Sequence, residues 1–320
     1  MPQSAVRRFS DADDYQAAIR AGNVEVILTN RGRFDAELTR IDLHKLWMQR
    51  GSDNLARIAR AANDPKRVPV FFLADNNQGA MRHGGLEVMP GELVFHREGS
   101  TDKHQTKGPS RWAAMSLAPE DLAAAGEAIA GRELIAPKDT HVLRPAPEAM
   151  IRLMTLHEAV GILAKTNAGV LAKPETATAL EQELVRTMVA CLTEHQLADV
   201  RRQPRQHVRT ITRFEEYLAK RKFEPVYLAE MCAAIGVSER TLRTRCQEHF
   251  GVGPVRYLWL RRMHLVRRAL MRADPGSSSV TTISTNHGFW ELGRFAVEYR
   301  ALFGESPRET LRGRSGLPLH

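Results

Sequence analysis

Four polar side chains near the carboxyl end of the chain have the types and spacing that suit hydrogen bonding to base edges. Arg240, Arg243, Thr244 and Gln247 recur at intervals of three and four residues, which places them on one face of a helix. An Arg fork pairs with guanine, a Gln amide suits adenine, and a Thr side chain contacts a thymine methyl or forms a hydrogen bond. Each could instead contact a phosphate or stay solvated. The opposite face is expected to be buried, with Leu242, Cys246 and Phe250.

A second helix, expected from about Trp290 to Phe303 with Phe295, Tyr299 and Leu302 facing inward, has a poorer set of outward residues. Glu291 and Arg294 face outward there beside Gly293 and Val297, which offer no polar side chain. We therefore expect the first helix to supply most of the sequence discrimination and the second to position the protein on the DNA backbone. The predicted DNA-binding set is Ser238, Arg240, Thr241, Arg243, Thr244, Gln247, Glu291 and Arg294.

Both helices belong to an internal repeat of two helix-turn-helix patterns. In each, a short helix is followed by a glycine, Gly236 or Gly288, whose freedom to adopt a positive φ lets two helices cross steeply. The helix that carries Arg240 and Gln247 is called the first reading helix, and the helix that carries Arg294 the second. Ser238 is expected to cap the first reading helix. Residues 254–272 read as one long helix between the repeats, which could hold the reading helices about one turn of DNA, roughly 34 Å, apart.

The charge distribution favours the same partner. The chain of 320 residues has a net charge of +9, but residues 201–320 hold 22 Lys and Arg against 11 Asp and Glu. Residues 1–200 hold 24 against 26. Twenty of the 22 cations are Arg, whose planar fork suits phosphates and guanine edges. A basic C-terminal part therefore indicates nucleic acid, and no stretch is apolar enough for a membrane helix.

The first part of the chain predicts strands followed by helices. Alternating apolar residues from Val24 to Leu28, and strands near residues 36, 70 and 94, suggest a barrel or sandwich. Helices are expected from Pro119, Pro147 and Pro174, with a turn at residues 167–169. The expected fold is α+β with two domains. Its parts are a β-rich barrel (1–145), a helical segment (146–198), a linker (199–208) and an all-α domain (209–313).

The second repeat carries a specific resemblance. The chain resembles the AraC/XylS family of bacterial transcription regulators through Gly288, Phe289, Phe295, Tyr299, Phe303, Gly304, Ser306 and Pro307. The resemblance implies a DNA-binding activator with two helix-turn-helix units and an N-terminal cupin-like domain that binds a small-molecule effector. It also implies a homodimer, paired through the helices of residues 146–198, and RNA polymerase as a candidate partner. The residues themselves leave open whether two chains pair through these helices or through the barrel. The effector and its binding residues stay open.

A metal-dependent cupin enzyme is the main alternative. His44, His83, His96 and His104 fall in the expected barrel, but none forms an HxH pair with a nearby Glu. Isolated histidines are therefore favoured over a metal site. We expect no metal, no cofactor and no catalytic residues.

Two further alternatives depend on other residues. An alkyl-transfer repair protein would need an early cysteine, but Cys191, Cys232 and Cys246 come late and without CxxC spacing. These three are expected to be small buried side chains. The sequence does not distinguish a regulator that responds to a protein partner from one that binds a small-molecule effector. With no signal core at its start, the chain is expected to be cytoplasmic.

Overall fold

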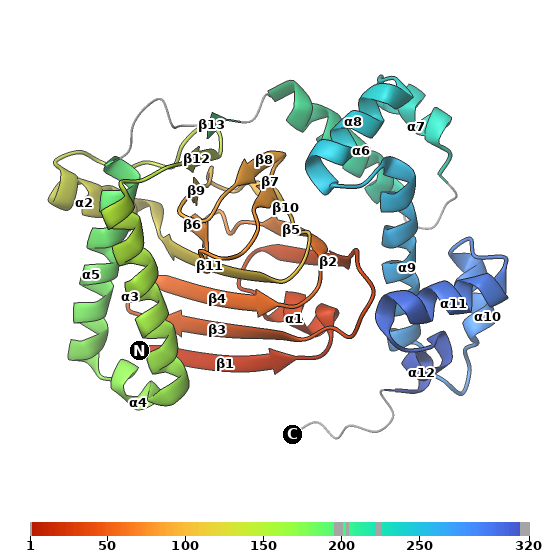
Figure 1. Cartoon of the computed structure of the whole chain (residues 1–320), viewed down its shortest axis with the longest axis horizontal. Coiled ribbons are helices and arrows are strands. Elements are labelled where there is room, and N and C mark those ends of the chain that lie inside the picture. The colour runs from red at the N-terminus through yellow and green to blue at the C-terminus, as the bar shows by residue number, and fades with distance from the viewer. Residues whose placement is uncertain (1, 195–200, 203–204, 222–225, 314–320) are drawn as a thin grey trace. The chain divides into compact units, whose positions relative to one another are not determined.

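The chain divides into two compact units. The computed structural model describes residues 2–194, 201–202, 205–221 and 226–313, with the backbone alone for 201–202 and 205–208. By the contacts among its residues, one unit comprises Met1–Val26 and Asp35–Gln203, and the other comprises Ile27–Phe34 and Pro204–His320. Figure 1 shows strands and green helices in the first unit and blue helices in the second. The predicted two-domain α+β class is confirmed.

Eight strands of the first unit form a large antiparallel sheet. In spatial order they are β1 (Gln3–Phe9), β3 (Ala36–Asp42), β4 (Trp47–Asp53), β11 (Ser110–Leu117), β6 (Val68–Leu73), β9 (Leu93–Phe95), β12 (His141–Leu143) and β13 (Arg201–Arg202). The apolar runs predicted near residues 36, 70 and 94 lie in β3, β6 and β9. Val70 pairs with Phe95 across β6 and β9.

A second sheet has five strands and does not close with the first. Its order is β2 (Asn23–Leu28), β5 (Arg57–Ala62), β10 (Thr101–Gln105), β7 (Met81–His83) and β8 (Leu86–Val88). A barrel requires its first and last strands to pair. Within the described residues, the large sheet instead ends at β1 and β13, and the small sheet ends at β2 and β8. The structure therefore has two open sheets in place of the expected barrel, and the cupin likeness stays a prediction.

Helices pack against the large sheet and complete the first core. These are α1 (Ala12–Ala18), α2 (Pro119–Ala130), α3 (Pro147–Thr166), α4 (Ala168–Leu171) and α5 (Pro174–Thr193). α3 and α5 lie side by side, and α3 also contacts β1 and β3 (Figure 1). Leu153 and Leu184 share one buried cluster with Met48, Phe72 and Met115 of the sheet. The predicted helix starts at three prolines are confirmed, whereas the predicted turn at residues 167–169 overlaps α4, a short helix.

The second unit is helical. Its helices are α6 (Arg205–Lys220), α7 (Leu228–Ile235), α8 (Glu239–Phe250), α9 (Pro254–Arg272), α10 (Val280–Asn286), α11 (Leu292–Phe303) and α12 (Pro307–Arg312). The predicted long helix matches α9 at both ends. Gly251 and Gly304 end α8 and α11 in the left-handed conformation, and Ser306 with Glu309 forms a capping box on α12.

The predicted linker overlaps the start of the second unit. α6 begins at Arg205, inside the predicted range 199–208, while residues 199, 200, 203 and 204 lie outside the described residues. Residues 27–34 group with the helical unit, which the sequence did not indicate. The division into sensor, dimerisation and DNA-binding parts stays a prediction.

Candidate DNA-binding surface and cavity

α7 and α8 form the first helix-turn-helix unit. Gly236 ends α7 with a φ of 72°, in the left-handed region, which is open to glycine without strain. The hydroxyl of Ser238 then accepts a hydrogen bond from the backbone N–H of Thr241 at 3.1 Å and caps α8. The Ser238 and Thr241 hydroxyls also lie 2.9 Å apart. Two of the predicted DNA-binding residues therefore have a capping role in the free protein.

The outer face of α8 presents the predicted reading residues. Arg240, Arg243, Thr244 and Gln247 are all exposed. The guanidinium of Arg243 lies 3.5 Å from the carboxylate of Glu239, one turn earlier. The Thr244 hydroxyl donates to the Arg240 carbonyl, and the Gln247 amide donates to the Gly251 carbonyl. The opposite face is buried as predicted, through Leu242, Cys246 and Phe250.

In the second helix-turn-helix unit, formed by α10 and α11, fewer polar side chains are available for contacts with DNA. The Nε of Arg294 donates to Glu298 at 3.0 Å, and its NH1 lies 3.9 Å from Glu291. Hydrogen bonding to Glu298 raises the pKa of Arg294. α11 begins at Leu292 with Glu291 at its N-cap position, two residues later than the helix start predicted at Trp290. The inward residues Phe295, Tyr299 and Leu302 are buried as predicted.

Sequence reasoning did not select Trp290 as a surface feature. Its side chain is 77% exposed, and it lies directly before α11. The sequence reading placed it inside the helix, although an indole at a helix start was a signal that could have been weighed. It adds a large aromatic surface beside the second reading helix.

The first unit contains a cavity of about 140 Å³. Its wall is mostly apolar and includes Trp47, Phe71 and Trp112. The buried guanidinium of Arg57 also lines it and is neutralised by Asp53, whose Oδ1 accepts from Nε at 3.0 Å. Apolar walls with a few fixed polar groups are the usual lining of a small-molecule site.

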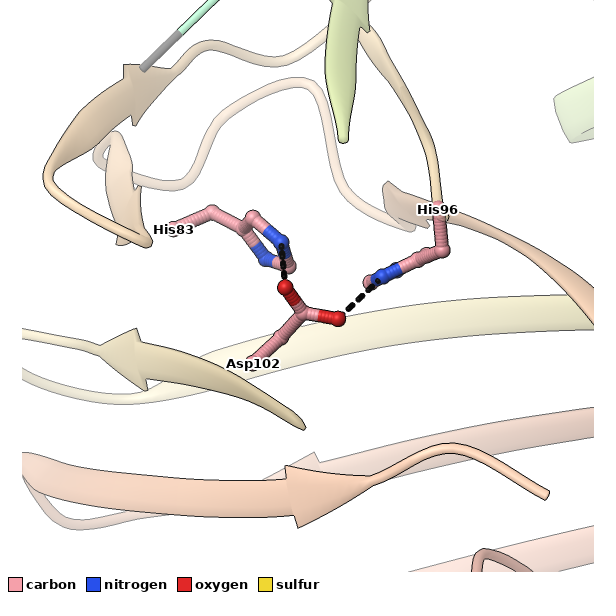
Figure 2. A group of neighbouring side chains, drawn as sticks. All are labelled: His83, His96 and Asp102. Atoms are coloured by element: carbon pink, nitrogen blue, oxygen red, sulfur yellow. Dashed lines mark hydrogen bonds and ion pairs between the residues drawn. The ribbon is translucent and has the colours of Figure 1, made fainter. Parts of the chain in front are cut away.

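A cluster of titratable side chains borders this cavity. His83 lies in β7, His96 follows β9, and Asp102 and His104 lie in β10, so the cluster joins the two sheets. Figure 2 shows both rings, of His83 and His96, directed at the Asp102 carboxylate. The His96 Nδ1 is 2.7 Å from Asp102 Oδ2, and the His83 Nε2 is 3.6 Å from Oδ1. His96 and His104 also line the cavity.

The prediction of isolated histidines is therefore wrong for three of the four. His83, His96 and His104 meet because β7 and β10 pair with His83 opposite His104, and the end of β9 approaches from the other sheet. His44 is separate and exposed, with its ring 3.1 Å from the Thr178 hydroxyl. The spacing of Asp102 and His104, two residues apart on a strand, was the signal that could have shown a shared face.

Burial and mutual charge shape the titration of this cluster. Burial lowers the pKa of His83, and burial with the neighbouring imidazoles lowers the pKa of His104 well below its usual value. Burial alone would raise the pKa of Asp102, but His96 and His83 hold it well below its usual range. The carboxylate is thus anionic in a buried setting and available as a ligand or ion-pair partner.

The three cysteines are buried thiols, as predicted. Burial raises the pKa of the Cys191 thiol to about 12. Within the described residues, no helix is long and apolar enough to cross a membrane.

Comparison with known proteins gives matches in the helical unit of the chain. Residues 231–313 match a family model described as a helix-turn-helix domain. The chain is 42% identical over 97 residues to the "Probable thc operon regulatory protein" of Rhodococcus erythropolis, a match that covers 30% of this chain and 29% of that protein. It is 36% identical over 101 residues to the "XylDLEGF operon transcriptional activator 2" of Pseudomonas putida, covering 32% of this chain and 62% of that protein. The matches thus span less than two thirds of these relatives.

Two solved structures align with most of the chain at low identity. The AraC-like transcriptional activator CuxR matches 88% of this chain and 99% of its own, with 16% identity and a TM-score of 0.43. ToxT from Vibrio cholerae matches 99% of both chains, with 9% identity and a TM-score of 0.32. The helix-turn-helix match, the operon-regulator relatives and the pattern from Gly288 to Pro307 agree. Residues 231–313 of this chain therefore form a helix-turn-helix domain of the AraC type, similar to the domains of these transcriptional regulators.

Proposed function

We propose that the chain is a sequence-specific, DNA-binding transcriptional activator. The observation that carries the proposal is the exposed face of α8, where Arg240, Arg243, Thr244 and Gln247 lie together on a capped helix after a tight turn. The relatives named as operon activators support the direction of regulation. Because activators act at promoters, RNA polymerase is the expected protein partner.

The two reading helices have different tasks in this proposal. Arg240 and Arg243 have exposed side chains that can reach guanine edges, whereas Arg294 is already paired with Glu298 and Glu291. α8 therefore supplies most base contacts, and α11 contributes more to backbone contacts and register. The helix between them, α9, has 19 residues and is about 28 Å long at 1.5 Å per residue. That length suits two helices in successive major grooves.

Selection from a random duplex library tests the proposal. The full chain is incubated with the library at physiological salt, and bound fragments are sequenced over several rounds. We expect one enriched motif with two conserved segments centred about 10 base pairs apart on one face of the duplex. Enrichment of no sequence over the input would contradict sequence-specific binding. A reporter gene placed downstream of the motif then separates activation from repression.

The cavity of the first unit is the proposed effector site. Its volume of about 140 Å³ is similar to that of an engineered apolar cavity of about 150 Å³ that binds benzene. The proposed effector is therefore a small molecule about the size of one aromatic ring, held against Trp47, Phe71 and Trp112. The proposal gives the chain no catalytic step and places it in the cytoplasm, with bacterial DNA.

Filling the cavity tests the effector proposal. A panel of single-ring and short aliphatic compounds is screened by the thermal stabilisation of the full chain. Ala59 lines the cavity, so Ala59→Met should abolish the stabilisation by any compound that binds there. A matched Ala128→Met change on an exposed site of α2 should leave it intact. A stabilising compound that is indifferent to Ala59→Met would overturn the assignment, and a response only to an added protein would indicate an adaptor instead.

The proposed active form is a homodimer paired through α3. Ile151 and Ile162 of this helix are 60% and 53% exposed. They are three turns apart and therefore on the same face. Two exposed isoleucines on one helix face suit an apolar contact between subunits.

A further inference from the structure

Three potential metal ligands from two sheets converge beside the cavity. His83, His96 and Asp102 each offer one ligand atom, and these atoms all lie within 4.8 Å of one another. His83 and His96 are 2% and 3% exposed. Figure 2 shows that their rings approach the carboxylate from different strands, so that its two oxygens face different rings. An ion between them would therefore join β7, β10 and the end of β9.

The His83 ring has a buried nitrogen that the described residues leave without a hydrogen bond. Its Nε2 has no hydrogen-bond partner there and lies 3.6 Å from Asp102 Oδ1, beyond hydrogen-bond distance. A buried polar atom without a hydrogen bond is destabilising in general, because it has lost its contact with water and gained no partner. The nitrogen therefore faces the carboxylate across a gap that suits a metal ion better than a direct hydrogen bond.

Neighbouring groups hold this set in a ligand geometry. The His83 Nδ1 lies 3.2 Å from the His104 Nδ1, so a proton on the His83 Nδ1 leaves the Nε2 lone pair free for a metal. The Asn63 amide donates to Asp102 Oδ2 at 2.9 Å, and the Ser100 hydroxyl donates to the same oxygen. Hydrogen bonds of this kind orient ligands in known metal sites.

We propose that His83, His96 and Asp102 bind one divalent transition-metal ion. Two imidazoles and one carboxylate suit Zn²⁺ or Fe²⁺, whereas Mg²⁺ and Ca²⁺ prefer oxygen ligands alone. A metal ion bound to the His96 Nδ1 replaces the direct contact of this atom with Asp102 Oδ2, which is now 2.7 Å away. Because His96 also lines the cavity, the ion lies at the cavity wall. This site is separate from the DNA-binding surface and does not depend on the proposed effector.

Titration of the full chain with Zn²⁺ and Co²⁺ tests the site. The protein is purified without an affinity tag and stripped with a chelator. Zn²⁺ binding is measured by calorimetry, and Co²⁺ binding by the visible absorption of its nitrogen- and oxygen-bound form. We expect one ion per chain. Asp102→Asn preserves the size of the side chain and should weaken Zn²⁺ binding by about a hundredfold or more, since even outer-shell changes cost 10- to 100-fold.

Matched variants keep the result clear. His44→Ala removes an exposed histidine outside the cluster and should bind Zn²⁺ like the unaltered chain. His83→Gln is a second ligand variant in case Asp102→Asn unfolds, with circular dichroism to report folding. No ion bound, or equal affinity in folded ligand variants and in His44→Ala, would overturn the proposal and leave the cluster as a hydrogen-bonded network.

Discussion

The exposed arginines of the two reading helices differ in their ionic partners. Arg294 is held by Glu298 at 3.0 Å, while Arg243 has the more distant Glu239 at 3.5 Å. A paired guanidinium must give up its carboxylate before it binds a base, which reduces the net gain. Arg240 and Arg243 should therefore contribute more to recognition than Arg294 does.

Replacing these arginines tests that order. Arg240→Ala or Arg243→Ala should each cost roughly 1 to 3 kcal/mol of binding free energy on the selected motif and relax the preference at one base pair. Arg294→Ala should cost less and weaken binding to all sequences alike. Affinities are measured by fluorescence anisotropy at one fixed salt concentration. Arg186→Ala, an exposed change on α5 of the first unit, is the control for net charge. A uniform loss on all sequences for Arg240→Ala would contradict base reading.

At the residue scale, the sequence predicted what depends on one helix and missed what depends on two sheets. The exposed face of α8 follows from helical spacing, so Arg240, Thr244 and Leu242 were placed correctly. His83 and His96 meet only through the pairing of β7 with β10 and the approach of β9. Strand pairing between distant segments has no local signal in one sequence, so only the shared face of Asp102 and His104 could have been predicted, and not the approach of His83 and His96.

At the scale of the element, the cap of α8 is a point where local stability can be measured. Ser238→Ala removes the acceptor for the Thr241 N–H, and the loss of an N-cap typically costs about 1 kcal/mol. Ser238→Asp retains an acceptor and places a negative charge at the helix start, so it should restore the cap. Hydrogen-exchange mass spectrometry of peptides from α8 measures the difference. Equal exchange in the Ala and Asp variants would show that the cap contributes nothing.

The contact of α3 with the large sheet should depend on pH through His157. This ring is 1% exposed and packs edge-on against Phe72. Burial and the charge of Arg50 lower its pKa from 6.5 to about 3. Between pH 6.5 and about pH 3, His157 is protonated in the unfolded chain and neutral in the folded chain. The free energy of unfolding therefore falls as the pH falls below 6.5. From pH 7 to pH 5 the expected loss is about 2 kcal/mol.

The buried thiol of Cys191 reports unfolding of this unit. Its exposure to alkylation is followed by mass spectrometry as urea rises, at pH 7 and at pH 5. His157→Gln cannot titrate in this range. The loss of stability between pH 7 and pH 5, measured from the urea midpoints, should therefore be smaller in this variant than in the unaltered chain by about 2 kcal/mol. An undiminished pH effect in His157→Gln would assign it to other groups.

Element bounds were predicted best where proline and glycine punctuate the helices. α2, α3, α5 and α9 begin at the predicted prolines because proline suits the first helical turn and lacks only a donor that would be unpaired there. α11 was misplaced because the Trp290 and Glu291 pair carries no such signal. The strands were predicted correctly but the closed barrel was not, since closure depends on which edge strands pair and not on any single strand.

At the scale of the whole molecule, pairing of two chains would multiply the affinity of each DNA-binding unit. Linked binding units gain from a high effective concentration only when both can engage their sites together. A dimer should therefore bind an operator with two copies of the motif far more tightly than a single copy, whereas a monomer would show little difference. Effector binding that changes the pairing would then change operator choice without changing α8.

Charged substitutions on α3 test this pairing. Ile151→Glu with Ile162→Glu places two carboxylates on the exposed face, where the fold of one chain should tolerate them because neither side chain is buried. We expect the double variant to halve the mass measured by light scattering and to lose the preference for the two-copy operator, while its affinity for one copy stays unchanged. Ala128→Glu on α2 adds a charge elsewhere on an exposed helix and should leave the mass unaltered. A dimeric double variant would show that the chains pair through another surface. A monomeric unaltered chain would contradict the proposed homodimer.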